Sequence, residues 1–312
     1  MKPEEIPNNF LNTSPRDTPL ESPNKSEENA EKEKDLPSEI LTHIAATYPF
    51  LNEEEYNSYM EKAVNIEPSN PIDEINEMVK LLNNPHAYFE KIDQNQDIED
   101  VENEKRPEKF PSGEMIDGVL YMRIPSFAVD RDQLEQQLEN IFLRYKDESI
   151  GLILDLRDNE GGHETPARAF AQKHFIKKGI HPVGTNIQLR KGGGLKRVKV
   201  NAYPEEGEKY EKPIAILISG KTFSSAERFV AVMKSGTDCV TIGTETFGGS
   251  ANPVKDLIEY DGDKYVLGIP RWRFYLEGKE KPIEDTKIEP DFYYDKEDIV
   301  DHAVKLIKEV AK

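Results

Sequence analysis

Residues 150–162 read IGLILDLRDNEGG, and this stretch indicates the fold class. The apolar run 150–156 has the length expected for a β-strand that is buried on both faces. The polar turn after it ends in Gly161-Gly162 and leads into a helix predicted from about Thr165 to Ile176. Strands buried on both faces are typical of parallel sheets that carry helices above and below.

The same pattern recurs further along the chain. Residues 214–219 (IAILIS) form a second buried run, followed by a predicted helix from about Ser225 to Met233 and a third strand at 240–243. Two successive strand–helix–strand steps predict an α/β fold with a mainly parallel sheet and right-handed crossovers. Further strands are predicted at 118–125, 257–260 and 264–269, the last two joined by the hairpin signal Asp261-Gly262, and further helices at 133–145 and 296–310.

The chain divides into four parts by composition. The N-terminal part is rich in proline and then in charge, so its burial of apolar surface cannot offset the ordering entropy. Pro37 and Ser38 are a plausible helix start, and apolar residues then recur at helical spacing. The predicted parts are a disordered acidic tail at 1–36, a helical N-terminal region at 37–91, an acidic linker at 92–117 and the main core at 118–312.

Charge and composition exclude several classes of protein. Lys and Arg number 41 and Asp and Glu number 60, giving a net charge of −19 and a pI near 4.9. Such a chain repels phosphate backbones, which argues against nucleic-acid binding as its main function. Cys239 is the single cysteine, so an intrachain disulfide and a cysteine-based zinc cage are excluded. No apolar run reaches the roughly 18 residues that a transmembrane segment needs.

Metal and cofactor sites have no support in the sequence. No pair of histidines has the helical spacing of a zinc site, and there is no calcium loop of alternating acidic residues. The Gly-rich stretch 191–194 lacks the Gly-Lys-Ser/Thr ending of a phosphate loop and is predicted to be a hairpin tip. We therefore expect neither a metal nor a cofactor.

The N-terminal sequence MKPEEI lacks the apolar region of a signal peptide. The compartment is left open: the cytoplasm is expected if Met1 is the natural start, and export with a removed signal if it is not.

Ser224 is a candidate nucleophile because it lies between a buried strand and a helix. A serine at that place would have its oxygen beside free amides and the positive end of the helix dipole, which favour an oxyanion. Ser224 and Glu227 also have the spacing of a capping box, which needs no catalysis. The Gly161-Gly162 turn has two interpretations as well, an anion-binding nest or an ordinary turn.

Six histidines are candidate general bases for such a nucleophile. His174 and His302 lie within predicted helices and are expected to face solvent. His163 adjoins the glycine pair and could line a site, whereas His86 follows a predicted helix in the stretch Asn84-Pro85-His86.

Six motifs in a fixed order resemble the tail-specific, or carboxyl-terminal processing, serine peptidase family. The similarity is greatest to the branch that holds the tricorn protease core and the interphotoreceptor retinoid-binding protein repeats, and it covers about 75–295. The motifs are NPH at 84–86, GVLYMRIPSF at 118–127, LILDLRDNEGG at 152–162, TFSSAE at 222–227, GTETFGGSANP at 243–253 and EDTKIEPD at 284–291.

This resemblance implies a Clp/crotonase-like core of ββα units and a set of catalytic roles. Ser224 would be the nucleophile, His86 its base and Glu284 the residue that orients the histidine. The oxyanion hole would come from the amide of Ser225 and from the turn of Gly161 and Gly162.

The sequence departs from the family pattern at several positions. The lysine base of the usual members falls at Gly249, so the resemblance implies no Ser–Lys pair. Pro85 replaces a serine that the tricorn-like branch carries before its histidine, Ala87 replaces a Thr or Ser, and Lys287 replaces a glycine. Only about 30 residues separate His86 from Gly118, which is too few for the PDZ domain of many members.

Three functions follow as expectations. The first is a serine endopeptidase acting on unfolded polypeptides or protein C-terminal tails. The second is a catalytically silent relative that binds a peptide or an apolar ligand, which the departures at Pro85, Ala87 and Lys287 motivate. The third is a crotonase-like acyl-CoA enzyme, against which stands the lack of a basic cluster for adenine or phosphate. A homo-oligomer is left open because relatives often assemble.

Overall fold

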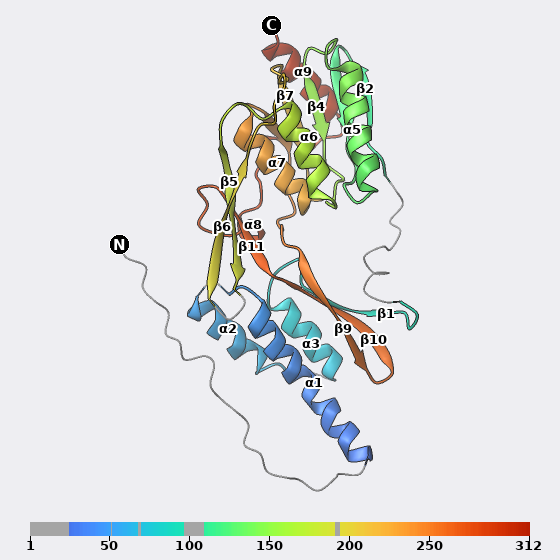
Figure 1. Ribbon diagram of the computed structural model, residues 1–312, viewed down its shortest axis with the longest axis vertical. Coiled ribbons are helices and arrows are strands. Elements are labelled where there is room, and N and C mark those ends of the chain that lie inside the picture. Colours follow the sequence, from blue (N-terminus) through green and yellow to red (C-terminus); the bar gives the residue numbers. More distant parts are fainter. Residues whose placement is uncertain (1–24, 51, 68–69, 97–108, 191–193) are drawn as a thin grey trace, which may run out of the picture.

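The computed structural model describes the chain except for residues 1–24, 51, 68–69, 97–108 and 191–193. The described part is a mixed α/β protein in which a mainly parallel sheet follows a small helical N-terminal region (Figure 1). The fold class predicted from the buried runs is therefore confirmed. Of the tail expected at 1–36, residues 1–24 lie outside the described residues.

A six-stranded sheet forms the centre of what we call the core module. Its strand order is β12-β8-β7-β4-β3-β2, and all neighbouring pairs are parallel except β2 with β3. The predicted buried runs lie at its middle, where helices cover both faces. The strands are β2 (Ser112–Ile116), β3 (Val119–Arg123), β4 (Leu152–Asp155), β7 (Ile214–Ile218), β8 (Val240–Gly243) and β12 (Phe292–Tyr293).

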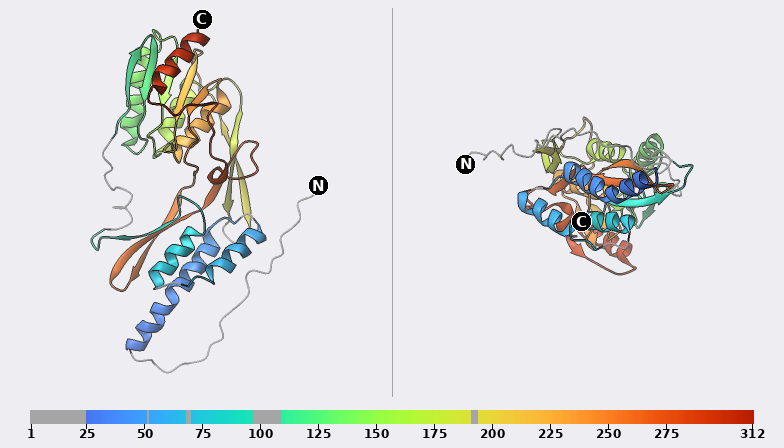
Figure 2. Two further views of the ribbon diagram at one scale, coloured as in Figure 1. Left: turned by 180° about the vertical axis from the view of Figure 1, so that it is seen from behind. Right: turned by 90° about the horizontal axis from the view of Figure 1, so that it is seen from below.

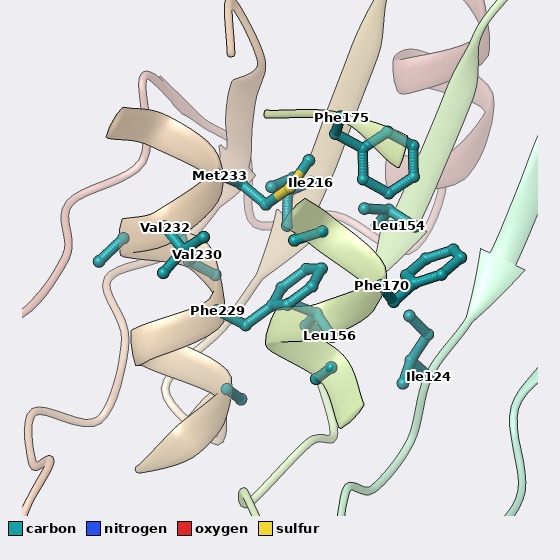
Figure 3. Close-up of a cluster of buried hydrophobic side chains, with 14 of the residues drawn as sticks. Ile124, Leu154, Leu156, Phe170, Phe175, Ile216, Phe229, Val230, Val232 and Met233 are labelled. Atoms are coloured by element: carbon teal, nitrogen blue, oxygen red, sulfur yellow. The ribbon is translucent and has the colours of Figure 1, made fainter. Parts of the chain in front are cut away.

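Helices pack on the two faces of this sheet because successive side chains of a strand point to opposite sides. Leu152 and Leu154 belong to the larger cluster, with α5 (Arg131–Tyr145), α6 (Glu164–His174) and α7 (Ser225–Gly236). Figure 3 shows this cluster, with Phe170 and Phe229 between the helices and the strands. Ile153 faces the other way, against the C-terminal helix α9 (Ile299–Val310).

Strand β2 differs from the sequence prediction, which assigned 112–116 to the acidic linker. Asp117 and Gly118 both have positive φ, 51° and 83°, and they connect β2 to β3 as a tight hairpin. Asp-Gly is a strong hairpin signal only where alternating apolar residues flank it, and the polar strand before Asp117 lacks that pattern. The sheet therefore begins before residue 118.

A three-stranded antiparallel sheet extends from the core module toward the helical end of the molecule (Figure 1). Its order is β11-β5-β6, formed by β5 (His181–Leu189), β6 (Leu195–Ala202) and β11 (Trp272–Leu276). Arg190 N–H donates to Gly194 O at 2.8 Å, which closes the predicted hairpin between β5 and β6, although the tip 191–193 lies outside the described residues.

We call the opposite end the helical module. Helices α1 (Lys25–Thr47), α2 (Glu53–Ala63) and α3 (Pro71–Lys80) pack against a sheet of order β1-β10-β9. Its strands are β1 (Tyr88–Ile92), β9 (Pro253–Tyr260) and β10 (Asp263–Pro270). Figures 1 and 2 show this module at the far end from α9.

The composition of the helical module differs from the predicted domain boundaries in two ways. The β9–β10 hairpin, which forms at Asp261-Gly262 as predicted, shares a hydrophobic cluster with the helices although the sequence placed it in the core. Helix α1 begins at Lys25 rather than at Pro37 and contains that proline.

His174 differs from its predicted place in solvent. Its ring is only 7% exposed and lies against Phe142 and Phe170, and its Nε2 is 2.8 Å from Glu139 Oε1. No local sequence pattern indicates this burial, since its partner Glu139 lies on a different helix. It is a structural residue of the core module. In the part of the chain that the structure describes, no helix is both long and apolar enough to cross a membrane.

Candidate active site

Ser224 lies in a strained turn between β7 and α7. Its φ and ψ are 58° and −120°, a region that a residue with a side chain occupies only when its surroundings impose it. Thr222 Oγ donates to Leu156 O at 2.9 Å, and Phe223 N–H donates to Asn159 O at 3.0 Å. These bonds tie the turn to the end of β4, in the manner of the sharp strand-to-helix turns that expose a nucleophile.

Glu227 anchors the loop that follows β8 to the start of α7. Its side chain is fully buried and accepts four hydrogen bonds, from Ser224 N at 3.1 Å, Thr246 Oγ at 2.5 Å, Gly248 N at 3.0 Å and Gly249 N at 2.9 Å. Burial raises its pKa to about 7. Both halves of the predicted capping box are therefore present, and the hydroxyl of Ser224 has a further contact.

His86 supplies the partner of that hydroxyl. Its Nε2 lies 3.2 Å from Ser224 Oγ, although the two residues come from opposite modules. The imidazole stacks on Phe223 with ring centroids 4.5 Å apart and an interplanar angle of 21°. Burial lowers the pKa of His86 to about 4, so the ring is neutral at pH 7 and can accept the serine proton.

Gly249 makes room for this histidine. A Cβ at residue 249 would lie 2.6 Å from atoms of both Phe223 and Pro85 and 3.4 Å from His86 Cε1. The resemblance places a lysine base at this position in other members. Here Phe223 and Pro85 occupy that space, so a side chain at residue 249 would displace the loop that carries His86.

The glycine turn lies directly against the serine. A Cβ on Gly161 would be 2.8 Å from Ser224 Cβ and 3.1 Å from Ser225 N, and Gly161 has a φ of 97°. Its N–H donates to Asn159 Oδ1 at 2.9 Å, so it is not free for an oxyanion, contrary to the sequence expectation. The amides of Gly162 and Ser225 have no acceptor among the hydrogen bonds of the described residues.

Glu284 reaches the histidine loop from the short helix α8 (Ile283–Thr286). Its Oε1 accepts from Asn84 Nδ2 at 3.3 Å, and Asn84 Oδ1 accepts from the backbone N–H of His86 at 3.0 Å. Its other oxygen, Oε2, is buried and has no hydrogen-bond partner among the described residues, and the same holds for Nδ1 of His86. The structure therefore brings Ser224, His86 and Glu284 to one place, with a direct contact only between the first two.

Lys287 explains one departure from the family pattern. Its φ is 47°, the left-handed region that favours the glycine found there in relatives. Its N–H donates to Ile283 O at 2.8 Å, and its ammonium pairs with Glu245. The turn that carries Glu284 therefore forms without the glycine.

Two supporting residues, Asn159 and Asn84, were not identified from the sequence as parts of the site. Asn159 is fully buried and donates to Ile124 O at 3.0 Å while it holds the Gly161 N–H. Single asparagines carry no periodic signal, so only their neighbourhood to glycine or histidine could have pointed to them. Among the described residues, no group of three or more His, Cys, Asp or Glu side chains is arranged to hold a metal ion.

Solved structures that share this fold include three that cover most of the chain. A protein from Parabacteroides merdae is 18% identical with a TM-score of 0.67, covering 88% of this chain and 96% of its own. A lipoprotein from Streptococcus agalactiae is 17% identical with a TM-score of 0.60, covering 94% and 99%. The photosystem II D1 C-terminal processing protease is 14% identical with a TM-score of 0.54, covering 85% and 93%. At these identities the likeness concerns the fold.

A search of curated proteins finds no match to the sequence. The model of peptidase family S41, in contrast, matches residues 118–294, more than half of the chain. That range includes the Gly161-Gly162 turn, Ser224 and Glu284, while His86 lies before it. The chain belongs to peptidase family S41, and it is a serine-type peptidase.

Proposed function

We propose that this protein is an endopeptidase with Ser224 as nucleophile, His86 as general base and Glu284 as the residue that orients the histidine. The observation that carries the proposal is the 3.2 Å approach of His86 Nε2 to Ser224 Oγ. The contact joins two residues that are far apart in sequence and that belong to different modules. A neutral, buried imidazole at hydrogen-bond distance from a serine in a strained turn is the arrangement that activates a hydroxyl.

Ser224, His86 and one water molecule account for every bond and proton transferred in the proposed reaction. Ser224 Oγ forms a bond to the peptide carbonyl carbon as its proton moves to His86 Nε2, and the protonated imidazole then gives that proton to the leaving amine. A water molecule then attacks the acyl carbonyl carbon as His86 takes a proton from it. The bond to Ser224 Oγ breaks as His86 returns that proton to the serine, which releases the new carboxyl end. No cofactor is needed for either half.

The oxyanion would be held by the amides of Gly162 and Ser225. The Ser225 N–H lies at the first position of α7, where the helix dipole adds a positive partial charge. The close approach of Gly161 to Ser224 brings the glycine turn beside the same place. Each such donor contributes roughly 10²–10³ in rate in other acyl-transfer enzymes.

Glu284 is assigned its role from two complementary unpaired atoms. For Nε2 to accept a proton, the neutral imidazole must carry its hydrogen on Nδ1. That donor and the acceptor Glu284 Oε2 are both buried, and neither has a partner within the described part of the chain, which is a costly state for each atom. A hydrogen bond from Nδ1 to this carboxylate would satisfy both atoms and stabilise the imidazolium that forms during the reaction.

The proposed substrates are unfolded polypeptides or protein C-terminal tails. Phe247 is 51% exposed and packs edge-on against Phe223, with ring centroids 4.9 Å apart, beside the catalytic residues. An exposed aromatic ring at this place can contact apolar side chains of a substrate. Such side chains are accessible in an unfolded polypeptide but buried in a folded one. One structural neighbour is by name a C-terminal processing protease, which agrees with the second substrate class.

The test is digestion of casein, an unfolded protein, followed by mass spectrometry of the products. Ser224→Ala should reduce cleavage by about 10⁴-fold or more, since it removes the nucleophile. Ser235→Ala, at the other end of α7, changes a serine whose Oγ donates to Val232 O and should leave the rate unchanged. Equal cleavage by wild type and Ser224→Ala, both folded, would overturn the proposal.

A further inference from the structure

Asn84 is a buried amide that contacts both the base and its proposed partner. It is 7% exposed, at the end of the turn between α3 and β1. Its Nδ2 donates to Glu284 Oε1 at 3.3 Å, and its Oδ1 accepts from the His86 N–H at 3.0 Å. One side chain therefore joins the carboxylate of α8 to the backbone that carries the imidazole.

One contact of Asn84 holds an oxygen of Glu284, and the other holds the backbone of the His86 loop. Because Nδ2 binds Oε1, the second oxygen of Glu284, Oε2, is the buried one that no other described residue binds. Because Oδ1 holds the His86 N–H, and the Asn84 carbonyl also accepts from Ala87 N at 2.9 Å, the loop cannot rotate freely about residue 85. The same amide thus fixes the position of the donor and of the acceptor that must meet.

We propose that Asn84 is a positioning residue for catalysis, whose amide aligns Glu284 Oε2 with His86 Nδ1 and so sets the orientation of the base toward Ser224. This inference rests on the proposed function and adds to it a residue that the family motifs did not assign. Asn84 touches no reacting atom. It acts through Glu284 and through the backbone of His86.

The groups around Glu284 shift the pKa of its carboxyl in both directions, and the neutral donor Asn84 is one of them. Burial raises the pKa of Glu284, and the Asp285 carboxylate beside it acts in the same direction. The Arg273 guanidinium and the Asn84 hydrogen bond act in the opposite direction, toward the ionised form. Tyr48 also packs here with a pKa raised to about 12, so it stays neutral. Loss of the Asn84 donor is therefore expected to raise the pKa of Glu284 further.

Two substitutions separate positioning from simple support of the loop. Asn84→Ala removes both contacts. Asn84→Asp keeps an oxygen that can accept from His86 N, but it removes the donor to Glu284 and places a second carboxylate beside it. If Asn84 only holds the turn, the aspartate will rescue activity. If it positions Glu284, both variants will lose about 10²-fold in kcat with little change in KM, the size of effect expected for a misplaced catalytic group.

The experiment combines casein kinetics with nitrogen and proton NMR of protein labelled at histidine, in wild type, Asn84→Ala, Asn84→Asp and Glu284→Gln. The His86 signals are assigned by their loss in His86→Ala. Asn65→Ala, in which an exposed amide that donates to Glu61 O is removed, serves as the control. We expect a hydrogen-bonded proton on His86 Nδ1 in wild type and in the control, and its loss in the other three variants.

An unchanged Nδ1 proton in both Asn84 variants, or its absence in wild type, would overturn the inference, as would full kcat in Asn84→Asp. The NMR result does not depend on proteolysis. Lack of Ser224-dependent cleavage by wild type would therefore count against the proposed function, while the Nδ1 signals would still decide on Asn84.

Discussion

The two modules build their halves of the site in different ways. The core module presents Ser224 from a turn that is anchored by Asn159 and Glu227. Both side chains are fully buried and hydrogen-bonded to the backbone around the turn. The helical module presents His86 from a loop held by Asn84 and by stacking on Phe223. The nucleophile is thus fixed within one module, whereas the base is aligned only while the two modules stay in contact.

Polar side chains of the helical module take part in that contact. Arg273 of β11 is buried, pairs with Glu55 of α2 and lies 6.0 Å from the ring of Tyr48 of α1. The Asn84–Glu284 hydrogen bond lies on the same side of the site. Changes at this boundary should therefore lower activity while the fold of the core module persists.

A large loss of activity is expected from filling the space between the modules. In Gly249→Ala the new Cβ would meet Phe223 and Pro85 at 2.6 Å, so the histidine loop must move away from Ser224. We expect casein cleavage to fall by about 10²-fold. Gly220→Ala is the control, because a Cβ there has only one neighbour, at 4.0 Å. Full activity in Gly249→Ala would show that His86 does not need its observed place.

A smaller effect, on stability, is expected from changing Arg273, the buried cation at the boundary between the two modules. Arg273→Met should lower the free energy of unfolding by about 2 kcal/mol, less than for a fully buried pair because Glu55 keeps one third of its side chain in solvent. Urea unfolding measures the change, and hydrogen exchange should show faster opening in α1 and α2. Arg271→Met, at an exposed neighbour, should change neither. Equal stability of the two variants would contradict the role of Arg273.

The smallest effect is expected in the pH profile. Burial lowers the pKa of His86 to about 4, so the neutral, basic form persists well below pH 6.5 and is lost only as the pH falls through about 4. We expect kcat/KM to decline about tenfold per pH unit below that value. The decline should follow the His86 titration measured by NMR. An acidic decline centred near 6.5 would mean that the base is solvated.

Much of the core module could be predicted from the sequence because its signals are local. The runs 150–156 and 214–219 became β4 and β7, and Asp261-Gly262 formed its hairpin. Ser224 could be singled out because a serine between a buried strand and a helix has a recognisable place. Strand β2 could not be predicted, because its polar residues show no alternation and its pairing depends on β3.

The boundary between the modules could not be predicted, because its contacts join distant segments. The sequence assigned 253–270 to the core, but the hairpin packs under the helices. The resemblance implied roles for His86 and Glu284 but none for Asn84, although Asn84 belongs to the NPH motif. The use of the Gly161 N–H by Asn159 likewise depends on a turn geometry that no residue pattern encodes.

The pairing of a nucleophile from one module with a base from the other is tested most directly by the rate at which a serine-directed phosphonate labels Ser224, with the site found by mass spectrometry. We predict that Ser224 is the residue labelled in wild type and that His86→Ala slows labelling by about 10²–10⁴-fold, while His181→Ala does not. Equal labelling of Ser224 in wild type and His86→Ala would contradict the account.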